Sequence, residues 1–152
     1  MTDESPLDRA PIEHSIWIDA SPADVFDYFV DPEKLVQWMG ATASLEPRPN
    51  GKYELAFKEG WISRGEFIVV NRPHRLVYTV GWEGNAEFPP GSTRVELTFR
   101  SEKGGTRLQL RHFGPPSTGL EKEGWAMYLA RLTAVAEQRD SPPDPFDRLS
   151  EA

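Results

Sequence analysis

Alternation of apolar and polar residues predicts that most of the chain forms β-sheet. In residues 12–19, "IEHSIWID", the side chains of His14, Ile16 and Ile18 share one face of a strand. Between residues 42 and 113, six further alternating segments are separated by turn sequences. These predicted strands cover residues 42–47, 52–57, 61–70, 75–82, 92–100 and 106–113. Because short turns join most of them, we expect about seven strands in an antiparallel sheet.

Two short helices are predicted between the first and second strands. Ser21 followed by Pro22 is typical of a helix start, and apolar residues behind them fall on one helical face. Asp31 ends this helix, because a residue that precedes proline is driven out of the α region. The same residue can cap a second helix over residues 31–40. We expect a corner there, with Trp38 either wedged into it or lying on the floor of a cavity.

The last predicted element is an amphipathic helix of about 20 residues, which would be about 30 Å long. Thr118 and Glu121 have the spacing of a capping box. Behind them, apolar residues recur at helical spacing: Trp125, Tyr128, Leu129, Leu132, Val135 and Ala136. We expect one domain over residues 12–138, a flexible N-terminus over 1–11, and a disordered or loosely docked tail over 139–152, where proline and charge occur without periodicity.

Composition favours a folded domain without cysteine chemistry. The chain has 152 residues, is 38% hydrophobic, and contains five Trp and eight Phe, which suffices for the core of a single domain. The absence of Cys excludes disulfides, thiolate metal ligands and cysteine nucleophiles. The N-terminal sequence has no apolar signal core, and no stretch approaches the ~18 apolar residues of a membrane span. We therefore expect a soluble, cytoplasmic protein without membrane insertion.

The charge of the chain argues against nucleic-acid binding. There are 17 basic and 24 acidic residues, which give a formal net charge of −7. The basic residues do not form runs, whereas neutralising phosphates requires clustered Lys and Arg. No nucleic-acid partner is expected.

The sequence contains no recognisable catalytic or metal-binding motif. There is no Gly-x-Ser-x-Gly elbow, and His14, His74 and His112 lack the spacing of metal ligands. We predict no catalytic residue, no metal and no cofactor, although whether a reaction is catalysed stays open. His112 has two interpretations, because it shares a strand face with Leu108 and Leu110. It could bind a ligand or act as a general base, or, as we favour, it is a satisfied polar group at a strand end.

The order of elements, together with particular residues, resembles the START-like helix-grip (SRPBCC) superfamily. More narrowly it resembles the AHSA-type family, homologues of the activator of the ninety-kilodalton heat-shock protein's ATPase. The matching segments extend from residue 12 to about 138. They are "IDASPADVFDYFVDPEKLVQWM", "EPRPNGKYEL", "GEFIVVNRPHRLVYTVGW", "STRVELTF", "GTRLQLRHFG", and Gly124-Trp125 before "LARL".

This resemblance implies an α+β fold, in which a curved antiparallel sheet surrounds the long C-terminal helix and an apolar cavity lies between them. The aromatic residues outnumber what a dry core requires, so some are expected to line that cavity; the alternative is that all are core. The candidates are Trp38, Tyr53, Phe57, Trp61, Phe67, Tyr78, Trp82, Leu97, Leu110, His112, Trp125, Tyr128 and Leu129. Among them, Tyr53, Tyr78 and Tyr128 are the natural hydroxyl donors.

The function that this resemblance implies is binding of a small hydrophobic or aromatic molecule, lipid-like or polyketide-like, in the cavity. One alternative is a protein-interaction role as a chaperone ATPase activator. The eukaryotic activators carry an additional N-terminal domain for which 152 residues leave no room, which weakens this alternative. A second alternative is a cyclase or dehydratase that uses the same cavity. We expect a monomer or a dimer, in which the exposed edge of the strand over residues 61–70 could pair between subunits.

Overall fold

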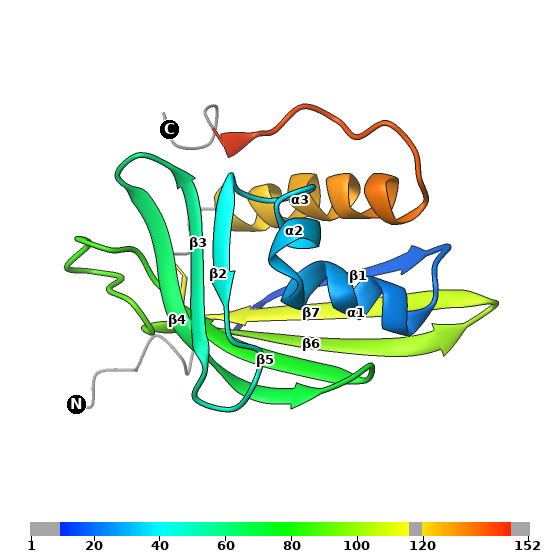
Figure 1. Cartoon of the computed structure of the whole chain (residues 1–152), viewed down its shortest axis with the longest axis horizontal. Helices are drawn as coiled ribbons and strands as arrows, with labels where there is room; N and C mark the ends of the chain where they lie inside the picture. The colour runs from blue at the N-terminus through cyan, green and yellow to red at the C-terminus, as the bar shows by residue number, and fades with distance from the viewer. Residues whose placement is uncertain (1–9, 116–119, 147–152) are drawn as a thin grey trace.

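A computed structural model describes residues 10–115 and 120–146, and these residues form a seven-stranded sheet (Figure 1). The strands are β1 (Ile12–Ile18), β2 (Thr42–Leu45), β3 (Lys52–Lys58), β4 (Trp61–Asn71), β5 (Arg75–Val80), β6 (Thr93–Glu102) and β7 (Gly105–Phe113). All neighbouring strands pair antiparallel, in the order β1-β7-β6-β5-β4-β3-β2. The predicted sheet is confirmed. The strand over residues 61–70 is not an edge, because β4 pairs with both β3 and β5; the edges are β1 and β2.

The helices lie on one face of this curved sheet, and the longest of them crosses it (Figure 1). They are α1 (Pro22–Val30), α2 (Pro32–Leu35) and α3 (Leu120–Ala136). The α+β arrangement of a curved sheet around a long C-terminal helix is therefore confirmed. The predicted capping box of α3 includes Thr118, which lies outside the described residues.

Asp31 produces the corner between the two short helices. It has extended backbone angles, with φ −94° and ψ 117°, so α1 ends there. Its carboxylate accepts a hydrogen bond of 2.9 Å from the backbone N–H of Glu33, which caps α2. Ser21 caps α1 in the same way, accepting from the N–H of Asp24 at 3.1 Å. The second helix is shorter than the predicted span of 31–40, and Trp38 lies in the turn that follows it.

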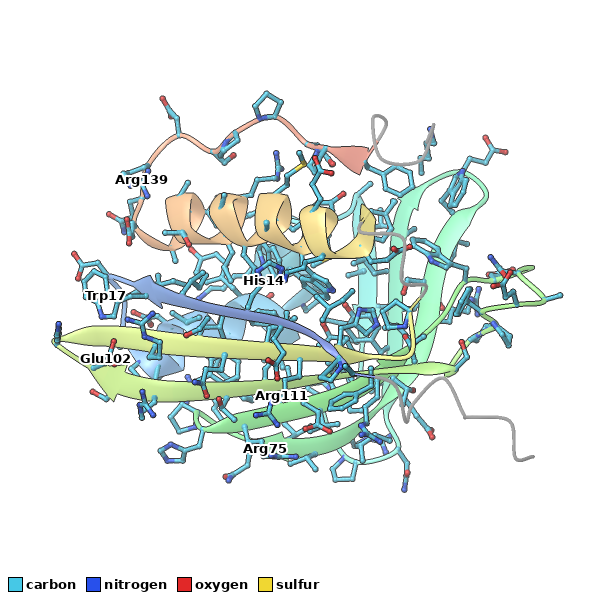
Figure 2. All side chains as sticks on the ribbon, turned by 180° about the vertical axis from the view of Figure 1, so that it is seen from behind. His14, Trp17, Arg75, Glu102, Arg111 and Arg139 are labelled. Carbon is cyan, nitrogen blue, oxygen red and sulfur yellow. The ribbon has the colours of Figure 1, made fainter. Side chains whose placement is uncertain are left out.

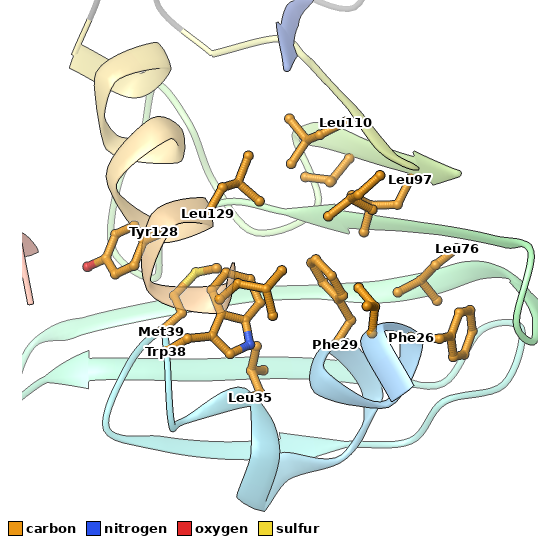
Figure 3. Packing of buried hydrophobic residues seen from close by; sticks show 14 of the residues in the cluster. Phe26, Phe29, Leu35, Trp38, Met39, Leu76, Leu97, Leu110, Tyr128 and Leu129 are labelled. Atoms are coloured by element: carbon orange, nitrogen blue, oxygen red, sulfur yellow. The ribbon is translucent and has the colours of Figure 1, made fainter. Parts of the chain in front are cut away.

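Trp38 is a wedge in the hydrophobic core. Its side chain is fully buried, and Figure 3 shows it packed beside Phe29 and Met39. The ring centroids of Trp38 and Phe29 are 5.0 Å apart with an edge-on angle of 71°. The indole N–H donates a hydrogen bond of 2.9 Å to the backbone carbonyl of Tyr28, so α1 and the turn after α2 are joined directly. Burying a side chain of this size stabilises the fold by about 2–3 kcal/mol.

The face of the sheet that lies away from the helices is polar. The face toward the helices is therefore the apolar, inner face. Figure 2 shows Arg75, Glu102 and Arg111 on this outer side, away from α3. Arg107 pairs with Glu102 at 2.8 Å, and Arg111 pairs with Glu13 at 3.3 Å. Because side chains alternate along each strand, the intervening residues of β6 and β7 point inward. In the described residues, no helix is long and apolar enough to cross a membrane.

After α3 the chain turns back and runs over this helix toward β3 and β4 (Figure 1). We call residues 137–146 the C-terminal segment. Arg131 of α3 donates a hydrogen bond to the backbone carbonyl of Pro142, and the Tyr128 hydroxyl donates to Asp144 at 3.1 Å. Pro145 is buried. The described part of the predicted tail, residues 139–146, therefore contacts α3, and residues 147–152 lie outside the described residues.

Candidate functional site

A cavity of about 620 Å³ lies between the sheet and the first turns of α3. Its walls come from the inner faces of β3 to β7, from the loop that joins β5 to β6, and from the end of the C-terminal segment. Eight of the residues predicted for a cavity line it: Tyr53, Phe57, Trp61, Tyr78, Trp82, His112, Trp125 and Tyr128. The other five lie in the core cluster and not among the lining residues: Trp38, Phe67, Leu97, Leu110 and Leu129.

The division between core and cavity follows position along the strands. The inner face of each strand continues from the region under α1 to the region under the start of α3. Leu97 and Val95 are both inner-face residues of β6, yet only Val95 reaches the cavity wall. Alternation identifies which residues lie on the inner face. It does not show where along the strand the core ends and the cavity begins.

Several residues that line the cavity were not predicted from the sequence, and Ser63, Thr93 and Phe146 matter most for its chemistry. Ser63 lies two residues after Trp61, and Thr93 lies two before Val95. Extending the alternation that identified their neighbours would have found both. No sequence signal pointed to Phe146, because it lies in a proline-rich stretch without periodicity.

His112 belongs to a chain of hydrogen bonds across the cavity wall. The indole N–H of Trp125 donates to His112 Nδ1 at 3.0 Å. With Nδ1 occupied as an acceptor, neutral His112 carries its proton on Nε2 and donates it to Thr93 Oγ1, at 2.9 Å. The Thr93 hydroxyl in turn donates to the backbone carbonyl of Val80 at 2.9 Å. The chain therefore links α3 to β7, β6 and β5.

Burial lowers the pKa of His112 from 6.5 to about 4. A second proton would have to enter at Nδ1, where the Trp125 N–H already points. Both ring nitrogens are thus used inside the protein, which leaves no free lone pair for a ligand proton. Of the two interpretations of His112, the geometry supports the satisfied polar group.

Two stacked tyrosines form the inner wall of the cavity. The rings of Tyr53 and Tyr78 are 4.4 Å apart and nearly parallel, at 10°. Burial raises the pKa of both hydroxyls, so both stay protonated at neutral pH. A protonated phenol is a hydrogen-bond donor, and Ser63 adds a third hydroxyl to this part of the wall.

The loop between β5 and β6 is held tightly against the cavity. Asn85 Oδ1 accepts hydrogen bonds from the backbone N–H groups of Glu87 and Phe88, at 2.9 and 2.8 Å. The N–H of Trp82 donates to the Phe88 carbonyl at 2.8 Å. A side chain at Gly81 would overlap the carbonyl oxygen of Pro89, so the loop can approach only because residue 81 is glycine.

Four aromatic residues gather at one side of the cavity, and we call them the aromatic mouth: Phe57, Trp61, Trp82 and Phe146. Trp61 is 39% exposed, so this group borders solvent. Phe146 stacks on Phe57, with centroids 4.7 Å apart and an angle of 16°. It meets Trp61 edge-on at 5.7 Å and Trp82 at 6.5 Å and 44°.

The charged side chains among the described lining residues are Glu87 and Glu121, and these residues include no Lys or Arg. Lys58 lies at the aromatic mouth, with its ammonium 5.5 Å from the centroid of the Phe146 ring. Within the described residues, no group of His, Asp or Glu is arranged to hold a metal ion. The site therefore offers aromatic surface, neutral hydroxyls, two carboxylates on the wall and one ammonium at the mouth.

A curved sheet around a long helix, with an aromatic cavity between them, defines a START-like helix-grip protein. The family model described as "Activator of Hsp90 ATPase homolog 1-like protein" (AHSA1) matches residues 19–137. The chain belongs to this family. Among curated proteins, none matches the chain.

Solved structures agree with this assignment. An AHSA1-like protein from Rhizobium etli is 42% identical, with 95% of this chain and 92% of that chain covered and a TM-score of 0.72. DynU16, from the dynemicin biosynthetic locus, is 20% identical with a TM-score of 0.76, covering 90% of this chain and 51% of that one. An HSP90 activator from Plasmodium falciparum is 23% identical with a TM-score of 0.59, covering 72% and 76%. The last two show the fold alone.

Proposed function

We propose that this protein binds a small hydrophobic or aromatic molecule, without negative charge, in the cavity between the sheet and α3. The observation that carries the proposal is the cavity itself: about 620 Å³, with walls that are mostly aromatic and aliphatic and a few polar tips. Sites for small ligands have volumes of roughly 300–1,000 Å³ and the same composition.

The polar groups of the wall suit a neutral acceptor on the ligand. The hydroxyls of Tyr53 and Tyr78 are hydrogen-bonded to each other, so the pair keeps one proton that it can donate to such an acceptor, for example a ketone, an ether or an alcohol, and Ser63 lines the same wall. A carboxylate or phosphate would be buried without a cationic partner among the described lining residues, and burying an unpaired anion is costly. The charged side chains of that wall, Glu87 and Glu121, are themselves carboxylates.

Three probes that share one ring system test this proposal: 2-naphthylmethanol, 2-naphthylmethylamine and 2-naphthoic acid. Isothermal titration at pH 7 should show binding of the alcohol and the amine, and at least about tenfold weaker binding of the acid. If the acid binds as well as the alcohol, the charge preference is wrong; if none of the three binds, the aromatic-ligand function is wrong.

Two substitutions on the same strand provide the matched control. Ser63→Phe adds a ring at a residue that lines the cavity and should abolish probe binding by filling it. Ile68→Phe adds a ring on β4 where the side chain is 41% exposed and should leave binding unchanged. Unfolding curves of both variants establish that each is folded before binding is compared.

A chaperone-related function is the second candidate, because the chain belongs to the AHSA1 family and one fold relative is an HSP90 activator. The test is the ATPase rate of a ninety-kilodalton heat-shock protein with and without this chain. An unchanged rate removes this candidate and leaves the cavity proposal standing. We assign no catalytic residue for a cyclase or dehydratase reaction, because both nitrogens of His112 are engaged.

A further inference from the structure

Phe146 occupies a position that resembles that of a bound aromatic ligand. Its ring lies against three aromatic side chains from three places in the fold: Phe57 on β3, Trp61 on β4 and Trp82 after β5. One contact is a parallel stack and another is edge-on, which are the two favourable arrangements for aromatic pairs. The three side chains thus present faces and edges that fit a planar ring.

The C-terminal segment holds this ring by few contacts. The backbone N–H of Phe146 donates to Asp144 Oδ1 at 2.8 Å, and the same oxygen accepts from the Tyr128 hydroxyl at 3.1 Å. Arg131 donates to the carbonyl of Pro142. These bonds lie on the surface of α3 and outside the sheet ladders, so release of the segment breaks no strand pairing, although it exposes the buried Pro145.

Figure 3 shows the Tyr128 hydroxyl directed away from the core and toward this segment. The ring of Tyr128 lines the cavity and lies 6.1 Å from Phe57. Tyr128 therefore contacts both the cavity and Asp144, the residue that holds the backbone of Phe146. A ligand in the cavity and the ring of Phe146 would thus share the same neighbouring side chains.

We propose that Phe57, Trp61 and Trp82 form a subsite for an aromatic ring, which Phe146 fills until an aryl ligand displaces it. The inference rests on the proposed function and specifies it, because it names the group that the ligand places at the mouth. The C-terminal segment then lowers the apparent affinity by the fraction of molecules in which the subsite is already occupied. Ligands with a planar ring gain most from displacing it.

Phe146→Ala is the decisive variant, and Pro143→Ala is its control, because it alters an exposed residue of the same segment and keeps the ring. The probes are 2-naphthylmethanol and its fully saturated decahydro analogue, titrated against the whole chain. We expect Phe146→Ala to bind the naphthyl probe about three- to tenfold more tightly than the wild type. The saturated probe should gain less, and Pro143→Ala should match the wild type.

Three results would overturn the inference. If Phe146→Ala binds the naphthyl probe no more tightly than the wild type, Phe146 does not compete with the ligand: it either packs on top of the bound ligand or does not contact it. If both probes gain equally, the mouth selects apolar volume and not rings. In both cases the proposed function survives, because the probes bind. If no variant binds either probe, the proposed function fails and this inference fails with it.

Discussion

Replacing His112 tests whether the fold holds this imidazole buried and neutral, through its effect on stability at mildly acidic pH. The folded protein holds this imidazole neutral, with a pKa of about 4, whereas an unfolded chain would have the ordinary value of 6.5. As the pH falls below 6.5, the unfolded state takes up a proton that the folded state refuses. Stability therefore decreases with falling pH between 6.5 and about 4, and it is unaffected by this residue above that range.

The size of the effect follows from the two pKa values. At about 1.4 kcal/mol per pKa unit, the full difference between 6.5 and about 4 amounts to about 3 kcal/mol. Between pH 7.5 and pH 5, linkage gives a loss of about 2 kcal/mol. The lowered pKa values of Asp27, Glu102 and Glu137 act at lower pH, since each starts from a reference value of 3.8 or 4.5.

The assay is urea unfolding of the wild type and of His112→Gln at pH 5, 6 and 7.5. Glutamine can accept from Trp125 through its carbonyl and donate to Thr93 through its amide, but it cannot titrate. The wild type should lose about 2 kcal/mol more than the variant over this interval. His74→Gln, at an exposed histidine, is the control and should keep the wild-type dependence. Equal slopes for the wild type and His112→Gln would refute the reasoning.

Three further substitutions test the corner, the cap and the loop. Trp38→Ala should destabilise the protein by about 3–5 kcal/mol in urea unfolding, because it empties a fully buried site; a loss below about 1 kcal/mol would contradict the wedge. Ser21→Ala should cost about 1 kcal/mol by loss of the α1 cap, whereas no change in the thermal midpoint would show that the cap is dispensable. Gly81→Ala should cost about 1–3 kcal/mol and weaken probe binding, because the new methyl group displaces Pro89; unchanged affinity would show that the loop does not shape the cavity.

The fold could be predicted from sequence because its signals are local. Alternation in β6 and β7 identifies the inner face, and the Asp31-Pro32 pair ends one helix and caps the next within two residues. The helix length after Asp31 was overestimated. Leu35 and Trp38 have helical spacing, but the chain leaves the helix after Leu35 and places the indole in the core through a turn. Tertiary packing outweighed propensity there.

The cavity could be predicted only in part, because its boundary depends on how much of the space beside each strand is filled by side chains from other elements. Leu110 and His112 have the same parity on β7, and both are buried, yet only His112 borders empty space. The difference lies in what faces each residue from α3. Trp125 reaches His112 with its N–H, while Leu110 belongs to the core cluster that also contains Leu129 of α3 (Figure 3). No pattern within a single strand contains that information.

Polar groups of the wall differ in whether they are free to serve a ligand. His112 and Thr93 satisfy one another and Val80, so they hold the wall in one arrangement and contribute shape. The hydroxyls of Tyr53 and Tyr78 stay protonated through burial and are hydrogen-bonded to each other, so one proton of the pair is left for a ligand. A ligand therefore meets a rigid hydrogen-bonded rim on one side and donors on the other. Specificity should depend on an acceptor placed opposite the tyrosines, because the histidine side has no free proton or lone pair to offer.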